Sequence, residues 1–303
     1  MERYMTLNTE SDNPASRDVD KLPASDIVKL INAEDAKVAA AVKTALPQVA
    51  QAVDTIVQAL SAGGRLFYIG AGTSGRLGVL DAVECVPTFS APPQLVQGII
   101  AGGDAALTEA VEGAEDDPLQ ARRDMRTRGV TAADVVCGIA ASGHTPYVVG
   151  ALNYARELGA ATIAVACNPG SSIGALAAVS ISVDLGPEII SGSTRMKAGS
   201  AQKMILNMLS TATMIRLGKV YGNLMVDLKV TNQKLAQRAN RLVRQITGVD
   251  EDNAERLLAQ ANNEVKTAVV MQMRHVDAES ARNLLTQSGG RLRQVIGHID
   301  AGD

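Results

Sequence analysis

Three loops of this sequence combine glycine with hydroxyl side chains, and each lies directly before a predicted helix. They are Gly70–Gly75, Ser142–Thr145 and Ser191–Lys197. Backbone N–H groups at a helix N-terminus point toward a bound anion, and nearby Ser and Thr hydroxyls add further donors. One such loop alone would say little, since turns use Ser and Gly freely. Three of them together favour a site that holds a phosphate group.

The first loop also matches the G-x-G-x-x-G pattern of dinucleotide sites, because it follows the apolar run Leu66–Ile69 and precedes a helix. A dinucleotide site needs an acidic residue about 20 positions further on to bind the adenosine ribose. The next apolar run, Leu95–Ala101, has no acidic residue before Asp104. The sequence therefore favours a phosphate monoester over a dinucleotide.

We predict that the substrate or its phosphate is bound by residues of these loops. Arg195 and Lys197 offer charge to an anion, although basic side chains on a solvated face are the ordinary alternative. His144 is more simply explained as a hydrogen-bonding or exposed side chain than as a general base. The predicted contacts are Gly72, Thr73, Ser74, Ser142, Gly143, Thr145, Ser193, Thr194, Arg195 and Lys197.

Two glutamates are candidates for acid-base chemistry. Glu84 lies in a largely apolar stretch at the end of the helix that follows the first loop, whereas Glu115 lies in an acidic, loop-like cluster. Apolar surroundings raise a carboxyl pKa, and polar surroundings keep a carboxylate ionised, so a pair can divide the roles of acid and base. An ordinary helix-terminal glutamate and a solvated acidic loop are equally compatible with this pattern.

The composition excludes several classes of function. Lys and Arg total 29 against 32 for Asp and Glu, and the chain has two Phe, five Tyr and no Trp. Such a chain has neither the basic surface nor the stacking aromatics that nucleic acids require, and no anionic membrane is expected as a partner. The ligand should be a small molecule held by hydrogen bonds and charge.

Cysteine and histidine usage points to a reducing compartment and to no metal. Cys85, Cys137 and Cys167 form no C-x-x-C pair, and the three histidines are far apart. The N-terminus lacks an apolar signal core, and no stretch reaches the length of a membrane span. We therefore expect a cytoplasmic protein without a metal or cofactor.

Five short apolar runs alternate with helical patterns in the middle of the chain, which predicts a parallel sheet. Apolar residues on both faces are typical of buried parallel strands, and a β-α-β-α order folds into a doubly wound α/β domain. Ligands of such sheets bind beyond the carboxyl ends of the strands. The runs are Leu66–Ile69, Leu95–Ala101, Val135–Ala140, Thr162–Ala166 and Val179–Val183.

The segments around this domain are predicted to be an N-terminal arm with helices and a small C-terminal helical bundle. The first twenty or so residues are polar and read as an extended arm, followed by a helix capped by Ser25. A long helix runs to Leu217, and Asp250, Asp277 and the glycines at 289 and 290 divide the last sixty residues into three short helices. The predicted domains are residues 1–62, 63–239 and 240–303.

From Thr9 to Gln294 the chain resembles the N-acetylmuramic acid 6-phosphate etherases, within the wider sugar isomerase superfamily. The resemblance is carried by five stretches, which are Tyr68–Gly78, Val111–Asp116, Gly138–Gly143, Ser193–Gly199 and Gly222–Asp227. It implies a mainly parallel five-stranded sheet of the sugar isomerase type. It also implies a homodimeric lyase that cleaves the D-lactyl ether of N-acetylmuramic acid 6-phosphate during cell-wall amino-sugar recycling, without a cofactor.

The resemblance places the proton donor on Glu84 and a second acid-base residue on Glu115. Two positions depart from the pattern, since His144 stands where relatives often carry Arg and Val86 where they often carry Pro. Two alternatives remain open, a sugar-phosphate isomerase and a sugar-phosphate-binding regulator without catalysis. A regulator has no need of a paired acid and base, whereas an isomerase needs one base.

Overall fold

The computed structural model describes residues 7–230 and 232–297 of the chain. Its chain divides into two compact units, the first formed by residues 1–83 and 94–210 and the second by residues 84–93 and 211–303. The division crosses helix α5 (Gly72–Phe89) between Val83 and Glu84. The predicted domain boundaries at residues 62 and 239 stay a prediction.

The first unit is built on a five-stranded parallel sheet with the order β2-β1-β3-β4-β5. This confirms the predicted sheet, and each predicted run overlaps an observed strand. All five residues of the interior strand β1 are buried, as expected for a strand covered on both faces. The strands are β1 (Leu66–Gly70), β2 (Val96–Ile100), β3 (Val135–Ala140), β4 (Ala161–Ala166) and β5 (Val179–Ser182).

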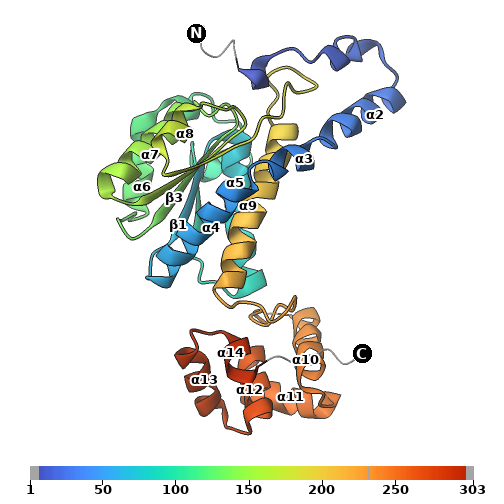
Figure 1. The fold of residues 1–303 in the computed structure, drawn as a ribbon, viewed down its shortest axis with the longest axis vertical. Coiled ribbons are helices and arrows are strands. Elements are labelled where there is room, and N and C mark those ends of the chain that lie inside the picture. The colour runs from blue at the N-terminus through green and yellow to red at the C-terminus, as the bar shows by residue number, and fades with distance from the viewer. Residues whose placement is uncertain (1–6, 231, 298–303) are drawn as a thin grey trace. The chain divides into compact units, whose positions relative to one another are not determined.

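Helices cover both faces of the sheet (Figure 1). On one face lie α6 (Pro118–Thr127), α7 (Pro146–Leu158) and α8 (Ser172–Leu176), and on the other lie α4 (Leu46–Ser61), α5 and α9 (Lys197–Arg216). Successive residues of β1 serve opposite faces, because side chains alternate along a strand. Phe67 and Ile69 pack with Tyr147 in one core cluster. Tyr68 points the other way, where a Cβ atom added at Gly78 of α5 would lie 2.9 Å from the Tyr68 Cβ.

The turn from β1 into α5 is tight enough to require glycine. A Cβ atom at Gly70 would lie 2.8 Å from the Gly75 nitrogen, and one at Gly75 would lie 2.6 Å from Cγ1 of Ile100. Both distances are shorter than a carbon side chain tolerates. The glycines of the first loop therefore bring the N-terminus of α5 directly against the end of β1.

The N-terminal segment contains three short 3-10 turns, η1 (Asn8–Glu10), η2 (Pro14–Ser16) and η3 (Val19–Lys21). The segment predicted to be an extended arm therefore contains 3-10 turns in its described part, and its residues 1–6 lie outside the described residues. Helix α2 (Ala24–Asp35) begins one residue before Ser25, and Pro23 rather than Ser25 occupies the N-cap position. Helix α3 (Val38–Lys43) leads into α4.

The second unit contains a helical bundle. Asp250 and Asp277 accept hydrogen bonds from backbone N–H groups at the starts of α11 and α13, as their sequence positions indicate. The prediction of three short helices is wrong, since four are described beyond residue 250. Asn262 and Asn263 adopt positive φ angles and separate α11 from α12, a conformation that asparagine tolerates. The helices are α10 (Gln233–Thr247), α11 (Glu251–Gln260), α12 (Val265–Arg274), α13 (Ala278–Gln287) and α14 (Leu292–Ile296).

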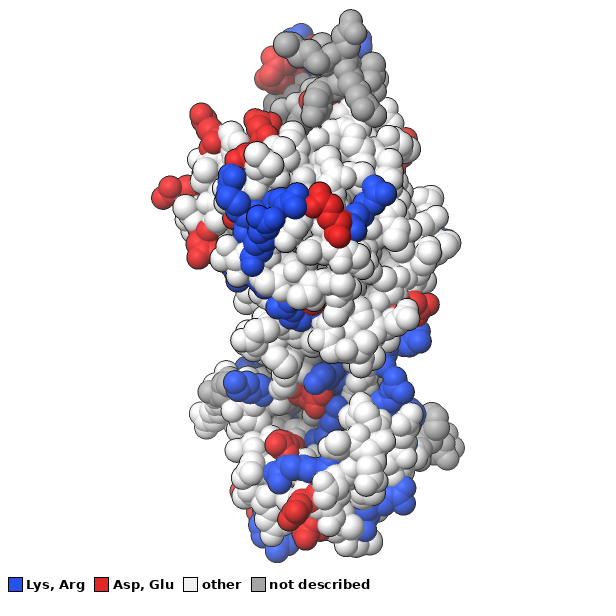
Figure 2. All heavy atoms as spheres, turned by 90° about the vertical axis from the view of Figure 1, so that its left-hand side faces the viewer, with Lys and Arg blue, Asp and Glu red and all other residues white. Residues whose placement is uncertain are grey.

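Acidic and basic side chains lie beside each other on the face that carries α6 and α7 (Figure 2). Arg122 pairs with Glu157 at 2.8 Å, and Arg123 pairs with Asp117 at 2.9 Å. Arg122 also lies over the ring of Tyr154, 4.7 Å from its centre. This mixture offers no extended field of one sign to a polyanion. None of the described helices combines the length and the apolar character that a membrane-spanning helix needs.

Candidate functional site

A pocket of about 430 Å³ lies in the first unit and is lined by the loops that follow β1 and β3. The strand order reverses between these two strands, and ligands of doubly wound sheets bind at such a reversal. We call this cavity the loop pocket. Its lining residues are Glu10, Ala71, Gly72, Thr73, Ser74, Glu115, Asp116, Ile139, Ala140, Ala141, Ser142, Thr145, Pro146, Gly192 and Thr194.

The first loop places Gly72, Thr73 and Ser74 on the pocket wall. Gly72 has φ 52°, a left-handed conformation that suits glycine. Since α5 begins at Gly72, the N–H groups of Thr73 and Ser74 have no helical carbonyl ahead of them. The Ser74 hydroxyl is buried and donates to Gln202 Oε1 at 2.9 Å. The backbone N–H groups and the Thr73 hydroxyl are therefore the donors that this loop offers to an anion.

The second loop contributes Ser142 and Thr145 to the pocket but not Gly143. Gly143 has φ 75°, and a Cβ atom there would lie 2.2 Å from the Cβ of Ser171. Its carbonyl accepts the N–H of Ile173 at 3.0 Å. Gly143 therefore serves the packing of this loop against α8, and the predicted contact with substrate is not supported by its position.

His144 has a hydrogen-bonding role in the same loop. Its Nδ1 lies 2.7 Å from the Ser172 hydroxyl and accepts the Ser172 N–H at 3.3 Å. A backbone N–H can only donate, so Nδ1 acts as an acceptor toward Ser172 in this geometry. This arrangement agrees with the simpler of the two sequence readings.

The third loop contributes Gly192 and Thr194, whereas Ser193 and Arg195 are not among the pocket residues. Arg195 instead borders a separate hollow of about 480 Å³ with Asp35 and Lys203. The structure therefore brings seven predicted residues to the loop pocket, namely Gly72, Thr73, Ser74, Glu115, Ser142, Thr145 and Thr194.

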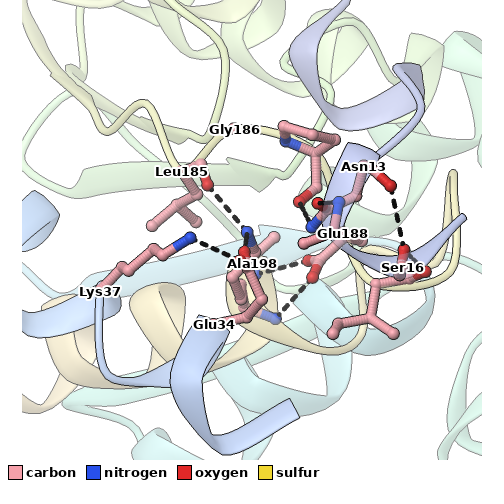
Figure 3. Close-up of polar contacts among 12 residues, drawn as sticks. Asn13, Ser16, Glu34, Lys37, Leu185, Gly186, Glu188 and Ala198 are labelled. Atoms are coloured by element: carbon pink, nitrogen blue, oxygen red, sulfur yellow. Dashed lines mark hydrogen bonds and ion pairs between the residues drawn. The ribbon is translucent and has the colours of Figure 1, made fainter. Parts of the chain in front are cut away.

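The N-terminus of α9 is already occupied by a carboxylate. Glu188, which is 1% exposed, accepts the N–H groups of Lys197 at 3.0 Å and of Ala198 at 2.9 Å (Figure 3). A buried carboxylate at this position interacts favourably with the positive end of the helix dipole and accepts hydrogen bonds from the first free N–H groups of the helix. The expectation that this helix start binds phosphate is therefore wrong, although Thr194 ahead of it does line the pocket.

Lys197 is a buried structural cation rather than a substrate contact. Its side chain is 2% exposed, and Nζ donates to Glu34 Oε2 at 2.6 Å and to the Leu185 carbonyl at 3.0 Å. Burial would raise the pKa of Glu34, but hydrogen bonds from Lys197 and Lys37 outweigh it and lower that pKa. The prediction for Lys197 is corrected accordingly, because its ammonium group is committed to holding α2 against the start of α9.

The two predicted catalytic glutamates lie on different elements. Glu115 belongs to the 3-10 turn η5 (Ala114–Asp116), is exposed and lines the loop pocket beside Asp116. Glu84 lies on α5, is exposed in this chain and is not among the lining residues of the loop pocket. Of the apolar residues in the stretch around Glu84, from Leu80 to Pro87, only Ala82 and Cys85 are buried.

The buried carboxylate of α5 is Asp81, which the sequence analysis did not single out. Asp81 is 9% exposed, and its Oδ1 accepts the Ser210 hydroxyl of α9 at 3.0 Å. Burial raises the pKa of Asp81 to about 6, and hydrogen bonds from Tyr68 and Ser210 limit the rise. The signal that could have identified it is helical spacing, because Asp81 shares the i, i+3, i+4, i+7 pattern of the buried residues Gly78, Ala82 and Cys85.

Three family models match stretches of the chain. Family models match at residues 48–156 (glucokinase regulatory protein N-terminal SIS domain), 120–212 (SIS domain) and 222–268 (C-terminal lid domain of glucokinase regulatory protein). A phosphoheptose isomerase from Francisella tularensis has a TM-score of 0.51 at 20% identity, covering 64% of this chain and 100% of that one. That likeness concerns the fold.

Two curated relatives are similar over nearly the whole chain. The N-acetylmuramic acid 6-phosphate etherase of Brucella anthropi is 55% identical over 290 residues, which cover 96% of this chain and 94% of the relative. That of Rhodopirellula baltica is 53% identical over 290 residues and covers 96% of both chains. Such identity along both units extends the likeness beyond the α/β domain.

Proposed function

The chain belongs to the N-acetylmuramic acid 6-phosphate etherase family, and we propose that its loop pocket binds N-acetylmuramic acid 6-phosphate. The reaction is the cleavage of the D-lactyl ether by elimination and hydration, giving N-acetylglucosamine 6-phosphate and D-lactate. It belongs to cell-wall amino-sugar recycling. The observation that carries the binding site is the convergence of Thr73, Ser142 and Thr194 from three loops at the strand reversal.

The phosphate is held by neutral donors in this proposal. Hydroxyl groups and the N–H groups at the start of α5 supply hydrogen bonds, and the helix adds the positive end of its dipole. Within the described residues, the loop pocket has no Lys or Arg in its lining. The proposed contacts of the phosphate are Gly72, Thr73, Ser74, Ser142, Thr145 and Thr194, while Ser193 and Arg195 stay predictions from the sequence.

The chemistry needs an acid and a base on either side of one bond. Opening of the sugar ring exposes an aldehyde at C1, which acidifies the proton on C2. A carboxylate removes this proton, and the C3–O bond breaks as a carboxylic acid protonates the lactyl oxygen that leaves. Water then adds to C3 and a proton returns to C2. We assign the base to Glu115, which lines the loop pocket, and the acid to Glu84, which does not line it in the single chain and is assigned from the family resemblance.

An isomerase and a binding regulator are the alternatives to this assignment. A phosphoheptose isomerase shares the fold at 20% identity, so the fold by itself does not select the reaction. The identity of 55% to an etherase over 290 residues does select it. A paired acid and base would also have no purpose in a regulator that only binds the sugar phosphate.

We further propose that the enzyme is a cytoplasmic homodimer. Helix α5 exposes 53% of Leu80 and 59% of Val83 in the single chain, and neighbouring exposed apolar side chains often mark an interface. A second copy of the chain seated on this strip would cover both residues. The three described cysteines are free and buried, which suits a reducing compartment.

The proposed function is tested by incubating the purified protein with N-acetylmuramic acid 6-phosphate and measuring released D-lactate. We expect D-lactate and N-acetylglucosamine 6-phosphate in equal amounts, without any added metal or cofactor. Conversion of the substrate to an isomer without D-lactate would support an isomerase. Binding without turnover by a protein that is folded and dimeric would support the regulator.

A further inference from the structure

The N-terminal arm forms part of the wall of the loop pocket. Asn168, which is 2% exposed, connects Thr9 of the arm to the second loop. Its Nδ2 donates to Thr9 Oγ1 at 2.9 Å and to the Ala141 carbonyl at 3.1 Å, and its Oδ1 accepts the Thr9 N–H at 3.4 Å. The arm is thereby fastened to a loop that we propose to bind phosphate.

A second set of hydrogen bonds fastens the arm to the third loop. The Gly192 N–H donates to the Thr9 carbonyl at 3.2 Å, and the Ser191 hydroxyl donates to the Glu10 carbonyl at 2.9 Å. Asn13 and Ser16 continue the same contact along the segment before α9, with Ser16 donating to the Ile189 carbonyl at 2.6 Å (Figure 3). The backbone of Thr9 and Glu10 is therefore held by Asn168 on one side and by the third loop on the other.

The Glu10 carboxylate lies directly against Gly192 and lines the pocket. A Cβ atom at Gly192 would lie 3.0 Å from Glu10 Oε2, so glycine leaves this carboxylate the room it occupies. Gly192 also has φ 75°, which a larger residue rarely adopts. The arm and the third loop therefore fit together with the Glu10 carboxylate in the wall of the loop pocket.

The charged side chains that line the described loop pocket are Glu10, Glu115 and Asp116, and all are acidic. A phosphate or a lactyl carboxylate is repelled by this group, whereas hydroxyl and amide N–H groups are attracted to it. The carboxylates therefore favour one orientation of an amino-sugar phosphate, with its anionic groups directed away from Glu10 and its neutral donors directed toward it.

We propose that Glu10 is a substrate-binding residue whose carboxylate accepts a hydrogen bond from a sugar hydroxyl or from the acetamido N–H. This inference rests on the proposed function, which supplies the amino-sugar phosphate. Glu10 disfavours the reversed orientation because its carboxylate repels the anionic groups of the substrate. It stabilises the productive orientation by a charge-assisted hydrogen bond. The assignment gives the arm a role in substrate recognition within its own chain.

The test compares Glu10→Ala and Glu10→Gln with Asp12→Ala, which removes an exposed arm carboxylate outside the pocket lining. A hydrogen bond to a charged group contributes enough that Glu10→Ala should raise KM for N-acetylmuramic acid 6-phosphate roughly 10- to 100-fold. The fall in kcat should be smaller than the rise in KM. Glu10→Gln keeps a hydrogen-bond acceptor, so its KM should lie between those of Glu10→Ala and the unaltered protein. The KM of Asp12→Ala should match that of the unaltered protein.

Inorganic phosphate separates recognition by Glu10 from loosening of the arm. Phosphate lacks the neutral donors, so its inhibition constant should be unchanged or lower in Glu10→Ala. A normal KM in Glu10→Ala, or equal weakening of substrate and phosphate, would overturn the inference. If the unaltered protein released no D-lactate, the proposed function would fail. The affinities for N-acetylglucosamine 6-phosphate and phosphate, measured by calorimetry, would then still test Glu10.

Discussion

At the scale of single residues, the central proposal is the division of labour between Glu84 and Glu115. Each has an amide replacement of nearly the same shape, so Gln variants should fold and bind sugar phosphate. Loss of a general acid or base typically lowers the rate by roughly 10²- to 10⁴-fold. We therefore expect D-lactate release by Glu84→Gln and Glu115→Gln to fall by at least about 100-fold, with binding preserved.

The two variants should differ in exchange of the C2 proton with deuterated solvent. Glu115→Gln removes the proposed base and should suppress exchange. Glu84→Gln can retain some exchange, because the C1 aldehyde lets the C2 proton leave before the lactyl group departs. Proton NMR of the substrate in deuterated buffer measures this directly. Near-normal D-lactate release by either variant would remove that residue from the mechanism.

At the scale of elements, the packing of α5 against α9 contains a buried acid that should make stability depend on pH. Burial raises the pKa of Asp81 from 3.8 to about 6. Between these values the folded protein holds a proton that the unfolded chain releases, so the free energy of unfolding should fall as pH rises through this window. The loss amounts to about 3 kcal/mol, because each unit of pKa difference corresponds to about 1.4 kcal/mol.

Asp81→Asn should remove this pH-dependent loss, because the amide does not ionise. Urea unfolding at pH 4.5 and pH 7 would measure the effect, with Asp252→Asn on an exposed face of α11 as the control. The expected result is a smaller decline in stability between the two pH values for Asp81→Asn than for the control. The same decline in both variants would show that Asp81 does not titrate in this window.

The elements also show which parts of the site a sequence can reveal. The strands were predictable because their apolar residues recur on both faces, and the first two loops because glycine and hydroxyl residues follow strand ends. The role of Lys197 was not predictable, since Glu188 caps its helix and Glu34 pairs with its side chain from 163 positions away. Glu10 was missed for the same reason, because its contact with Gly192 is made only when the chain folds.

At the scale of the whole molecule, the proposed homodimer depends on the exposed apolar strip of α5. Leu80→Asp would place a charge in this interface, and a buried unpaired charge is strongly unfavourable. We expect the variant to sediment as a monomer. Leu119→Asp is a matched control, since Leu119 is 63% exposed on α6 and has no part in the proposed interface. Unchanged sedimentation of Leu80→Asp would exclude this strip.

The fate of the ether oxygen distinguishes elimination followed by hydration from direct displacement at the lactyl carbon. Elimination breaks the bond between C3 of the sugar and the ether oxygen, so D-lactate keeps that oxygen. The new hydroxyl at C3 of N-acetylglucosamine 6-phosphate then comes from water. Displacement at the lactyl carbon would instead place the solvent oxygen in lactate.

The most direct measurement is mass spectrometry of both products after a reaction in ¹⁸O-labelled water. The label should appear at C3 of N-acetylglucosamine 6-phosphate and be absent from the hydroxyl of D-lactate. A parallel reaction in deuterated water should place one deuterium at C2 of the sugar. Label in the lactate hydroxyl, or a sugar product without deuterium at C2, would contradict the elimination and hydration mechanism and the roles given to the two glutamates.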